Sequence, residues 1–349
     1  MQQIYNRIID LIKKNLSQTN DKCVKFSDTN YKAIDFNKNN FHPIEDVKNN
    51  NVKIAFVDSG SAEILKSANF SLSLIRAYYS IYLNNKKIRS KKIDFYSFTK
   101  AVDKNNELYY ETEIFSNENI LNKDDLLLSS MDDTIKQGIA RADISTVSNL
   151  IRRFTELKSA LFLMDSLNPN DIIVLDGSLQ CNFTNERKYM DELLNKAKAK
   201  NIIISGLSKT TALMTDKGNS ITNALNKFNI SGKWLYHPVA EINSNEHKAE
   251  MAFAKLREKS KYMFRFEIYK EQKEKINEIA ALLSDNSKDP VFIGYPYGLI
   301  EADRNARISN NERSMMQTFF SVKFGKEWEK IKDSLTSTDA HEILDKISF

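Results

Sequence analysis

IAFVDSG at residues 54–60 and IIVLDGS at residues 172–178 are the two stretches that decide the fold of this chain. Each is a run of apolar, β-forming residues that reaches an aspartate and is followed closely by a glycine. This pattern is typical of a buried strand that ends in a turn. Asp58 and Asp176 are therefore expected at equivalent positions, each at the carboxyl end of a buried strand.

The segments around these stretches follow the order strand, strand, strand, helix, strand, helix, strand. The elements predicted from the pattern are strands at 52–57, 70–83 and 93–98 with a hairpin turn at 84–87, a helix at 145–167, a strand at 172–175, a helix at 186–200 and a strand at 202–205. This order predicts an α/β fold with a ribonuclease-H-like core and a mixed central sheet. The two later strands flank a helix, which implies parallel pairing through a right-handed crossover.

The remaining segments predict additions to this core rather than a second domain. Residues 1–50 are expected to form an amphipathic helix at 2–17, which either caps the core or contacts another copy or a partner, and then an irregular segment. Residues 51–310 are expected to form one elaborated domain whose core spans about 51–206, and residues 311–349 to form C-terminal helices. The elaborations expected in this domain are an insertion at 103–140, strands near 233–240, 249–256 and 261–269, a helix at 271–284 and a short strand at 290–293.

Composition narrows the class of protein without deciding its function. The 349 residues are 41% hydrophobic, which argues against disorder for most of the chain. The net charge of +5, from 51 basic and 46 acidic residues, permits nucleic-acid binding but does not require it. The two cysteines have no metal-binding spacing, and no apolar run approaches the roughly 18 residues of a membrane span. A cytoplasmic location is expected.

The carboxylates at the two strand ends, Asp58 and Asp176, are the candidate metal ligands. If the two strands are neighbours, Asp58 and Asp176 converge, and a divalent metal is the natural way to relieve their repulsion. The alternative is that each aspartate only begins a turn. Glu156, on the helix before the second strand, is the third candidate ligand, although a glutamate beside Arg152 and Arg153 is also typical of a solvated ion pair.

Four blocks of this sequence resemble the NurA nuclease family. They are IAFVDSGSAEIL around Asp58, LIRRFTELKSA followed by DIIVLDGSL around Glu156 and Asp176, GLSKTTALM at residues 206–214, and GYPYGLIEADRNARIS at residues 294–309. The order and spacing of the four blocks carry the resemblance.

The resemblance implies a ribonuclease-H-like fold, a homodimer, Mn²⁺- or Mg²⁺-dependent cleavage of DNA, and action beside a HerA-type hexameric ATPase in DNA end processing, either in repair or in antiviral defence. By the same resemblance, Asp58, Glu156 and Asp176 are expected to bind the metal, and Tyr295 to line the active site. Lys209 is expected there too, in contact with a DNA phosphate, although a merely solvated lysine is an equal alternative. Arg152 and Arg153 are further candidates for DNA contacts.

One departure from the family pattern concerns the last block. The family has a histidine after the alanine where this chain has Asp303. A carboxylate can replace an imidazole as a ligand of Mg²⁺ or Mn²⁺, so Asp303 is expected to complete the ligand set. It cannot act as a general acid near neutral pH unless its pKa is strongly raised. A catalytically weakened or inactive adaptor for DNA ends or for a translocase is therefore the alternative to a nuclease.

Nucleotide hydrolysis by this chain is not expected. Residues 206–210 read GLSKT, but no glycine stands at the position that a phosphate-binding loop requires upstream. The convergence or separation of the four carboxylates is the observation that distinguishes the nuclease from the adaptor.

Overall fold

The computed structural model describes residues 1–349 except 18–19, 48–50, 119 and 337–349. The chain forms two compact units. Unit 1 consists of Met1–Asn51, Asp176–Gln180 and Ile203–Tyr297, and unit 2 of Val52–Leu175, Cys181–Ile202 and Gly298–Phe349. This division differs from the single elaborated domain expected for residues 51–310. The chain passes between the units several times without a Pro/Gly-rich linker, so composition gives no sign of the boundary.

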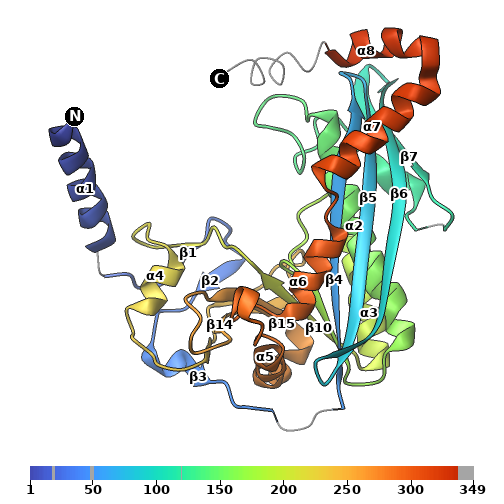
Figure 1. The fold of residues 1–349 in the computed structure, drawn as a ribbon. Helices are drawn as coiled ribbons and strands as arrows, with labels where there is room; N and C mark the ends of the chain where they lie inside the picture. The colour runs from blue at the N-terminus through green and yellow to red at the C-terminus, as the bar shows by residue number, and fades with distance from the viewer. Residues whose placement is uncertain (18–19, 48–50, 119, 337–349) are drawn as a thin grey trace. The chain divides into compact units, whose positions relative to one another are not determined.

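Unit 2 is built on a sheet of long strands (Figure 1) with the order β9-β4-β5-β6-β7-β8. The strands from β4 to β8 pair antiparallel with their neighbours, whereas β9 pairs parallel with β4. Three antiparallel strands followed by a parallel one is the order expected of a ribonuclease-H-like core. The strands are β4 (Lys53–Lys66), β5 (Phe70–Leu83), β6 (Lys86–Lys104), β7 (Glu107–Phe115), β8 (Leu127–Ser129) and β9 (Ile172–Asp176).

The hairpin between β5 and β6 forms as predicted. Strand β5 has the predicted bounds, and Asn84 and Asn85 make the turn with φ values of 51° and 59°. Asparagine tolerates this left-handed backbone better than most residues, and two such residues in succession suit the twist of a tight hairpin. The prediction that the first strand ends at Asp58 is wrong, because β4 continues through Gly60 to Lys66 opposite β5.

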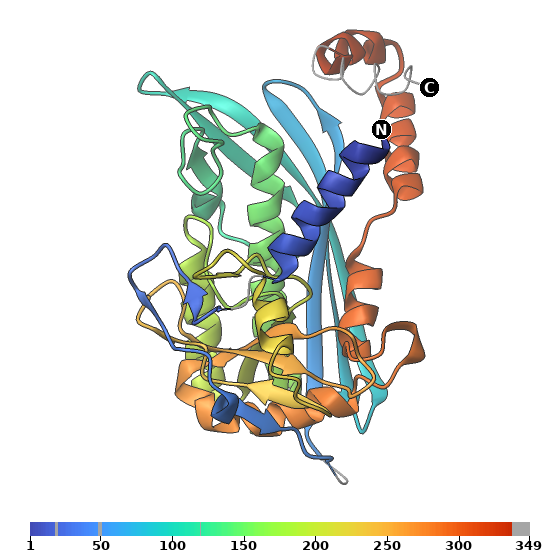
Figure 2. The same cartoon turned by 90° about the vertical axis from the view of Figure 1, so that its left-hand side faces the viewer.

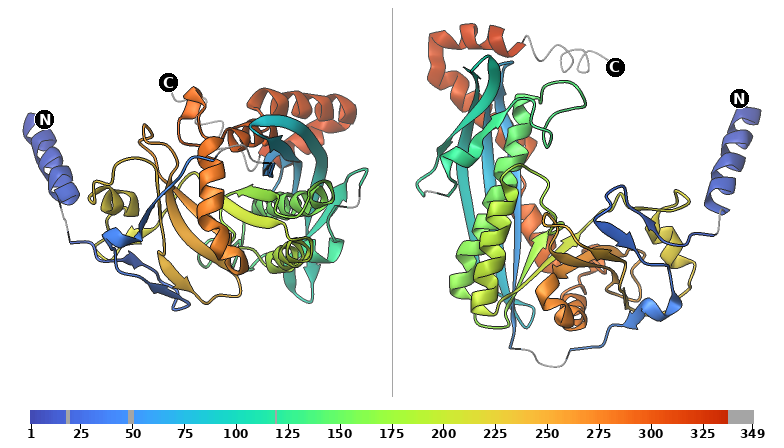
Figure 3. Two further views of the ribbon diagram at one scale, coloured as in Figure 1. Left: turned by 90° about the horizontal axis from the view of Figure 1, so that it is seen from below. Right: turned by 180° about the vertical axis from the view of Figure 1, so that it is seen from behind.

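Helices cover both faces of this sheet (Figure 3). Helices α2 (Val147–Leu163) and α3 (Glu186–Lys200) lie side by side on one face. Both were predicted, α2 from its apolar stripe. Helices α6 (Tyr297–Ala306) and α7 (Asn310–Phe324) lie on the other face, and the short helix α8 (Trp328–Thr336) follows α7. The segment at 103–140, expected as an insertion, supplies the outer strands β7 and β8 with a short 3₁₀ turn, Lys123–Leu126.

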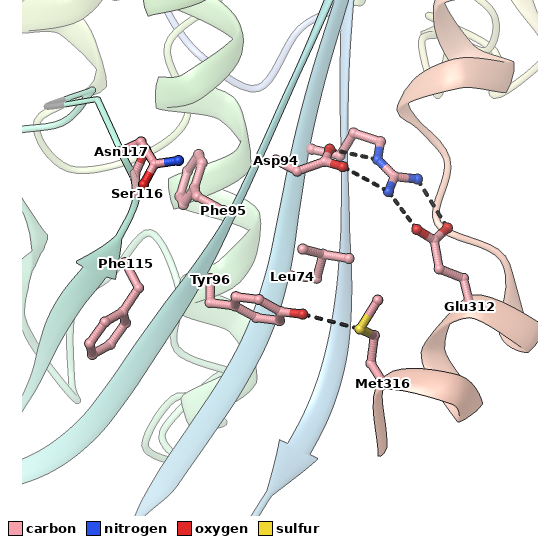
Figure 4. Close-up of a pocket in the computed structure, with 10 residues that line it drawn as sticks. Leu74, Asp94, Phe95, Tyr96, Phe115, Ser116, Asn117, Glu312 and Met316 are labelled. Atoms are coloured by element: carbon pink, nitrogen blue, oxygen red, sulfur yellow. Dashed lines mark hydrogen bonds and ion pairs between the residues drawn. The ribbon is translucent and has the colours of Figure 1, made fainter. Parts of the chain in front are cut away.

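Arg76 on β5 connects the sheet to α7 (Figure 4). Its guanidinium is buried and forms paired hydrogen bonds with Asp94 of β6 and with Glu312 of α7. These two carboxylates hold the pKa of Arg76 above its ordinary value. Beside this contact the hydroxyl of Tyr96 donates to the sulfur of Met316 at 3.1 Å, along a groove of 510 Å³.

Unit 1 contains a second set of strands, seen with helix α4 in the yellow and orange part of Figure 2. Their order is β3-β12-β14-β15-β10, and two further pairs, β1 with β11 and β2 with β13, are separate. The strands are β1 (Val24–Lys25), β2 (Tyr31–Ala33), β3 (Phe41–Pro43), β10 (Ile203–Ser208), β11 (Met214–Thr215), β12 (Trp234–Tyr236), β13 (Ala240–Ile242), β14 (Ala249–Lys255) and β15 (Phe264–Tyr269). The helices are α1 (Gln2–Ser17), α4 (Ile221–Asn226) and α5 (Ile276–Asp285).

Two sequence predictions for unit 1 are wrong. The described part of residues 18–50 is not irregular, since it contains the strands β1, β2 and β3. Each pairs with a strand about 190 to 210 positions further along the chain and is too short to show an alternating pattern. The strand expected at 290–293 is a 3₁₀ turn, Pro290–Phe292, because Asp289 caps it by accepting the Val291 N–H and Pro290 begins it.

The N-terminal helix was predicted correctly, and residues 1–14 are all exposed. Its apolar side chains are therefore not covered by the described part of the chain, including Ile4, Ile8, Leu11 and Ile12. Among the residues that the structure describes, no helix has the length and apolar content needed to cross a membrane.

The Arg76 contact yields a stability prediction. Arg76→Ala should lower the free energy of unfolding by about 2–3 kcal/mol, because it leaves Asp94 and Glu312 without their shared cation at a partly buried site. Urea denaturation followed by tryptophan fluorescence measures the change. The control Lys91→Ala breaks an exposed pair with Glu118 and should change stability by less than about 0.5 kcal/mol. Equal effects of the two substitutions would contradict the role given to Arg76.

Candidate metal centre

Asp58 lies within β4 and is buried, with 7% of its surface exposed. Its neighbour Val57 pairs with Leu175 of the parallel strand β9, so Asp58 and Asp176 are the next residues along two adjacent strands. The carboxylate of Asp58 accepts the backbone N–H of Ser59 at 2.6 Å. The two aspartates are neighbours because of strand register, as the sequence predicted, although β4 does not end there.

Helix α6 approaches β4 closely because each element has a glycine at the contact. A side-chain carbon at Gly60 of β4 would overlap the carbonyl oxygen of Ala306, at the end of α6. A side-chain carbon at Gly298, near the start of α6, would overlap the ring of Phe56 in β4. Gly60, expected to be a turn residue, thus permits close packing instead. This packing carries Asp303, on α6, to the strand that bears Asp58.

Glu301 fixes α6 to the sheet. Its buried carboxylate accepts hydrogen bonds from the hydroxyls of Tyr78 and Tyr82 on β5 and from the ammonium group of Lys87 on β6. Burial alone would raise the pKa of Glu301, but these three donors together lower it. The carboxylate therefore stays ionised and keeps the helix that carries Asp303 in place. The sequence offered no signal for this role, because it depends on three residues more than 200 positions away.

Asp58, Asp176 and Asp303 form an acidic cluster. Each offers one carboxylate oxygen, and these oxygens lie within 4.8 Å of one another. Exposure increases from the buried Asp58 through the partly buried Asp176 to the exposed Asp303. Three negative charges this close repel unless a cation or protons lie between them, and oxygen ligands of this kind suit Mg²⁺ or Mn²⁺. The residues present therefore fit a divalent metal.

Two further side chains contact Asp176. The ammonium group of Lys209 lies 2.5 Å from one carboxylate oxygen, and the hydroxyl of Tyr295 donates to the other at 3.2 Å. The ring of Tyr295 is fully buried and stacks on Phe292 with its centroid 5.4 Å away. Lys209, at the end of β10, is about one third exposed and also lies 5.9 Å above the Tyr295 ring. Both residues predicted to line the site are therefore at Asp176.

Glu156 lies beside the acidic cluster without belonging to it. One of its oxygens accepts the Ser59 hydroxyl at 2.9 Å, and the other pairs with Arg153 at 2.8 Å. It is buried and does not point to solvent. Ser59 follows Asp58 directly in β4, so the Ser59 hydroxyl links Glu156 to the strand that bears Asp58. No motif in the sequence indicated Ser59 as this connection.

The two arginines next to Glu156 differ in environment. Arg153 is buried and pairs with both Glu156 and Glu186, which together hold its pKa above the ordinary value against the effect of burial. Enclosed in this way, its guanidinium is not presented to a DNA backbone in this structure. Arg152 is about one third exposed and donates to the carbonyl oxygen of Ser59 at 2.9 Å. Of the pair, Arg152 has the position from which a phosphate can be contacted.

A family model described as the NurA domain matches residues 52–308, which is most of the chain. The chain belongs to the NurA family. The matched range includes every residue of the acidic cluster together with Glu156, Lys209 and Tyr295. The resemblance of the four sequence blocks to the NurA family is confirmed.

Solved structures give the same result for the fold. The NurA nuclease from Sulfolobus solfataricus is similar with a TM-score of 0.50 and 16% sequence identity, covering 94% of this chain and 98% of that one. The predicted mixed α/β fold with a ribonuclease-H-like core is confirmed. The catalytic domain of human endonuclease V is similar with a TM-score of 0.39 and 10% identity, covering 90% of this chain and 98% of that one, a likeness too weak to carry an argument. No curated protein matches this chain significantly in sequence.

The acidic cluster yields a prediction for Asp303. Asp303→Asn should raise the dissociation constant for Mn²⁺ at least about tenfold, because loss of a charged ligand should weaken binding no less than loss of a group that only supports a ligand. Isothermal titration calorimetry measures the constant directly. The control is Glu113→Gln, at an exposed carboxylate on β7. Superimposable titration curves for parent and Asp303→Asn would remove Asp303 from the ligand set.

Proposed function

We propose that this chain is a divalent-metal-dependent deoxyribonuclease that hydrolyses phosphodiester bonds. The observation that carries the proposal is the meeting of three carboxylates from β4, β9 and α6, with oxygens within 4.8 Å of one another. Membership of the NurA family supports it, and so does the fold shared with a solved NurA nuclease.

Mn²⁺ is the proposed metal, with Mg²⁺ as its substitute. Asp58, Asp176 and Asp303 would supply the first ligands, with Glu156 joining by a rotation away from Ser59. When bound, one or two such cations would activate water and stabilise the charge that develops on the scissile phosphate. A ligand set of oxygens alone is compatible with either ion, because both accept carboxylates readily.

The surrounding residues would prepare this site for DNA. Tyr295 holds one oxygen of Asp176 and so fixes the direction of its carboxylate. The ammonium group of Lys209 offsets part of the negative charge of the cluster and is exposed enough to contact a phosphate. Arg152, beside the carbonyl of Ser59, would make a second phosphate contact.

The non-catalytic adaptor predicts that Glu156 or Asp303 points to solvent, whereas the enzyme predicts that all four carboxylates converge. Glu156 is buried, and its carboxylate contacts Ser59. Asp303 is exposed, but its oxygen is a member of the cluster. Three of the four carboxylates converge, and the fourth, Glu156, is buried next to Ser59, which supports the enzyme.

Nuclease activity is tested by two substitutions. Asp58→Ala and Asp176→Ala should each abolish Mn²⁺-dependent digestion of linear duplex DNA while the protein stays folded, because each removes a ligand and also relieves charge repulsion. Digestion is measured on gels, and folding by circular dichroism. Glu113→Ala should digest DNA like the parent. Full activity in either aspartate variant would overturn the assignment.

We further propose that the protein works as a homodimer beside a HerA-type hexameric ATPase in DNA end processing, in repair or in antiviral defence. The apolar face of α1 is exposed at Ile4, Ile8 and Ile12, and α7 exposes Met315 and Phe319. Exposed apolar rows of this kind suit contacts with a second copy. The chain also lacks a complete phosphate-binding loop, so movement along DNA would have to come from a separate motor.

Light scattering coupled to size-exclusion chromatography tests the dimer. At micromolar concentration the parent should have twice the mass of one chain, and Ile8→Lys should lower the dimer fraction because it places a charge on the apolar face of α1. A monomeric parent would refute the dimer. Adding the cognate ATPase and ATP should accelerate digestion of long duplex DNA at physiological salt; absence of both binding and acceleration would refute the motor partnership alone.

A further inference from the structure

Unit 1 contains a buried pair of ionisable side chains that the proposed reaction does not use. Glu267 on β15 is 1% exposed, and His247, just before β14, is fully buried. Their side chains are 3.0 Å apart, between His247 Nε2 and a Glu267 oxygen. Placing a carboxylate in the interior is costly, so an enclosed glutamate is retained only where several donors compensate its charge.

Three groups donate to Glu267, and a fourth, the Tyr31 hydroxyl, contacts His247. Arg265 Nε donates to one oxygen of Glu267 at 2.5 Å, and the other oxygen accepts both His247 Nε2 and the backbone N–H of Leu179, the last at 2.7 Å. The Tyr31 hydroxyl lies 2.9 Å from His247 Nδ1. The tautomer that satisfies both partners of His247 carries its proton on Nε2 and accepts from Tyr31 at Nδ1.

The Glu267 carboxyl and the Tyr31 hydroxyl of this network have pKa values far from neutral pH. Burial would raise the pKa of Glu267, but the charge of Arg265, the contact with His247 and the Leu179 N–H lower it to about 2. Burial raises the pKa of Tyr31 to about 12. Glu267 therefore remains a carboxylate and Tyr31 a neutral hydroxyl donor under working conditions.

The contact with Leu179 connects the network to the acidic cluster. Leu179 is buried and lies three residues after Asp176. Between them, the N–H of Gly177 donates to the carbonyl of Leu207 on β10 at 3.1 Å. Glu267 lies opposite Gly206 of the same strand β10. The chain leaving Asp176 is thus held at Gly177 by the backbone of β10 and at Leu179 by the carboxylate of Glu267.

We propose that Glu267 is a positioning residue for Asp176. Its ionised carboxylate, held by Arg265 and His247, fixes the backbone of residues 177–179 and thereby the place from which Asp176 reaches a metal. The inference rests on the proposed metal-dependent function. Glu267, on β15, would contact neither metal nor DNA, yet it would set the affinity of the site for the ion.

A metal titration with a matched control tests this role. Glu267→Gln keeps the size of the side chain but loses the charge that pairs with Arg265 and strengthens the bond from Leu179. The Mn²⁺ dissociation constant, measured by calorimetry on the intact protein, should rise about tenfold, as for removal of a group that supports a metal ligand. The maximal rate of DNA cleavage at saturating Mn²⁺ should fall much less than the affinity does.

The control variant is Glu250→Gln. Glu250 is a partly buried glutamate of β14 that pairs with His237 in the same unit, and no contact with residues 176–180 is described for it. It should bind Mn²⁺ like the parent. If Glu250→Gln and Glu267→Gln weaken Mn²⁺ binding equally, the effect is general destabilisation and the positioning role is overturned. Parental affinity in Glu267→Gln overturns it as well.

A second measurement covers the case in which Glu267→Gln does not fold. Hydrogen exchange of the parent, followed at single amides by NMR, should place the Leu179 amide among the slowly exchanging ones even without metal. Exchange as fast as in an exposed loop would refute the hydrogen bond to Glu267 and with it the proposal. Failure of the proposed function is separate, because it would appear as absence of Mn²⁺ binding and DNA cleavage in the parent itself.

Discussion

Close packing of α6 against β4 is the constraint on which the acidic cluster depends. Gly60 and Gly298 leave no side chain at the two points where strand and helix meet, and Glu301 holds the helix down through Tyr78 and Tyr82. Without this packing Asp303 would not reach Asp58, because the two residues are 245 positions apart in the chain. Two glycines and one buried glutamate thus bring Asp303 to Asp58, although the two carboxylates repel each other.

Contacts from several strands hold the aspartates of the cluster in place. Parallel register between β4 and β9 makes Asp58 and Asp176 neighbours, and Lys209 and Tyr295 hold Asp176 directly. Glu267 holds the backbone that follows Asp176 from a separate strand. Lys209 offsets part of the charge of Asp176, and a divalent ion is the natural counter-charge for three carboxylates this close together. Rigid supports of this kind are what a metal site needs, because the ligands must keep their geometry while they repel one another.

The sequence predicted the parts that depend on local pattern. Strand β5 and helix α3 have the predicted bounds, since alternation and helical spacing are read from neighbouring residues. Asp58 and Asp176 were identified from their apolar surroundings. The extension of β4 beyond Asp58 was not predicted, because Asp-Ser-Gly is a common turn sequence. The packing of α6 on Gly60 cannot be read from neighbouring residues. Strands β1 to β3 were missed because each depends on a partner far along the chain. The pairing of Arg153 with Glu186 likewise follows from the packing of α2 on α3 and not from any motif.

Anomalous diffraction from crystals grown with Mn²⁺ is the sharpest test of this metal centre, because it locates the ion without relying on activity. A manganese peak is expected within bonding distance of oxygens of Asp58, Asp176 and Asp303. A shift of the Glu156 side chain toward this peak would agree with its proposed role. Crystals that contain Mn²⁺ at other positions, with no peak among these three carboxylates, would show that the acidic cluster is not a metal centre.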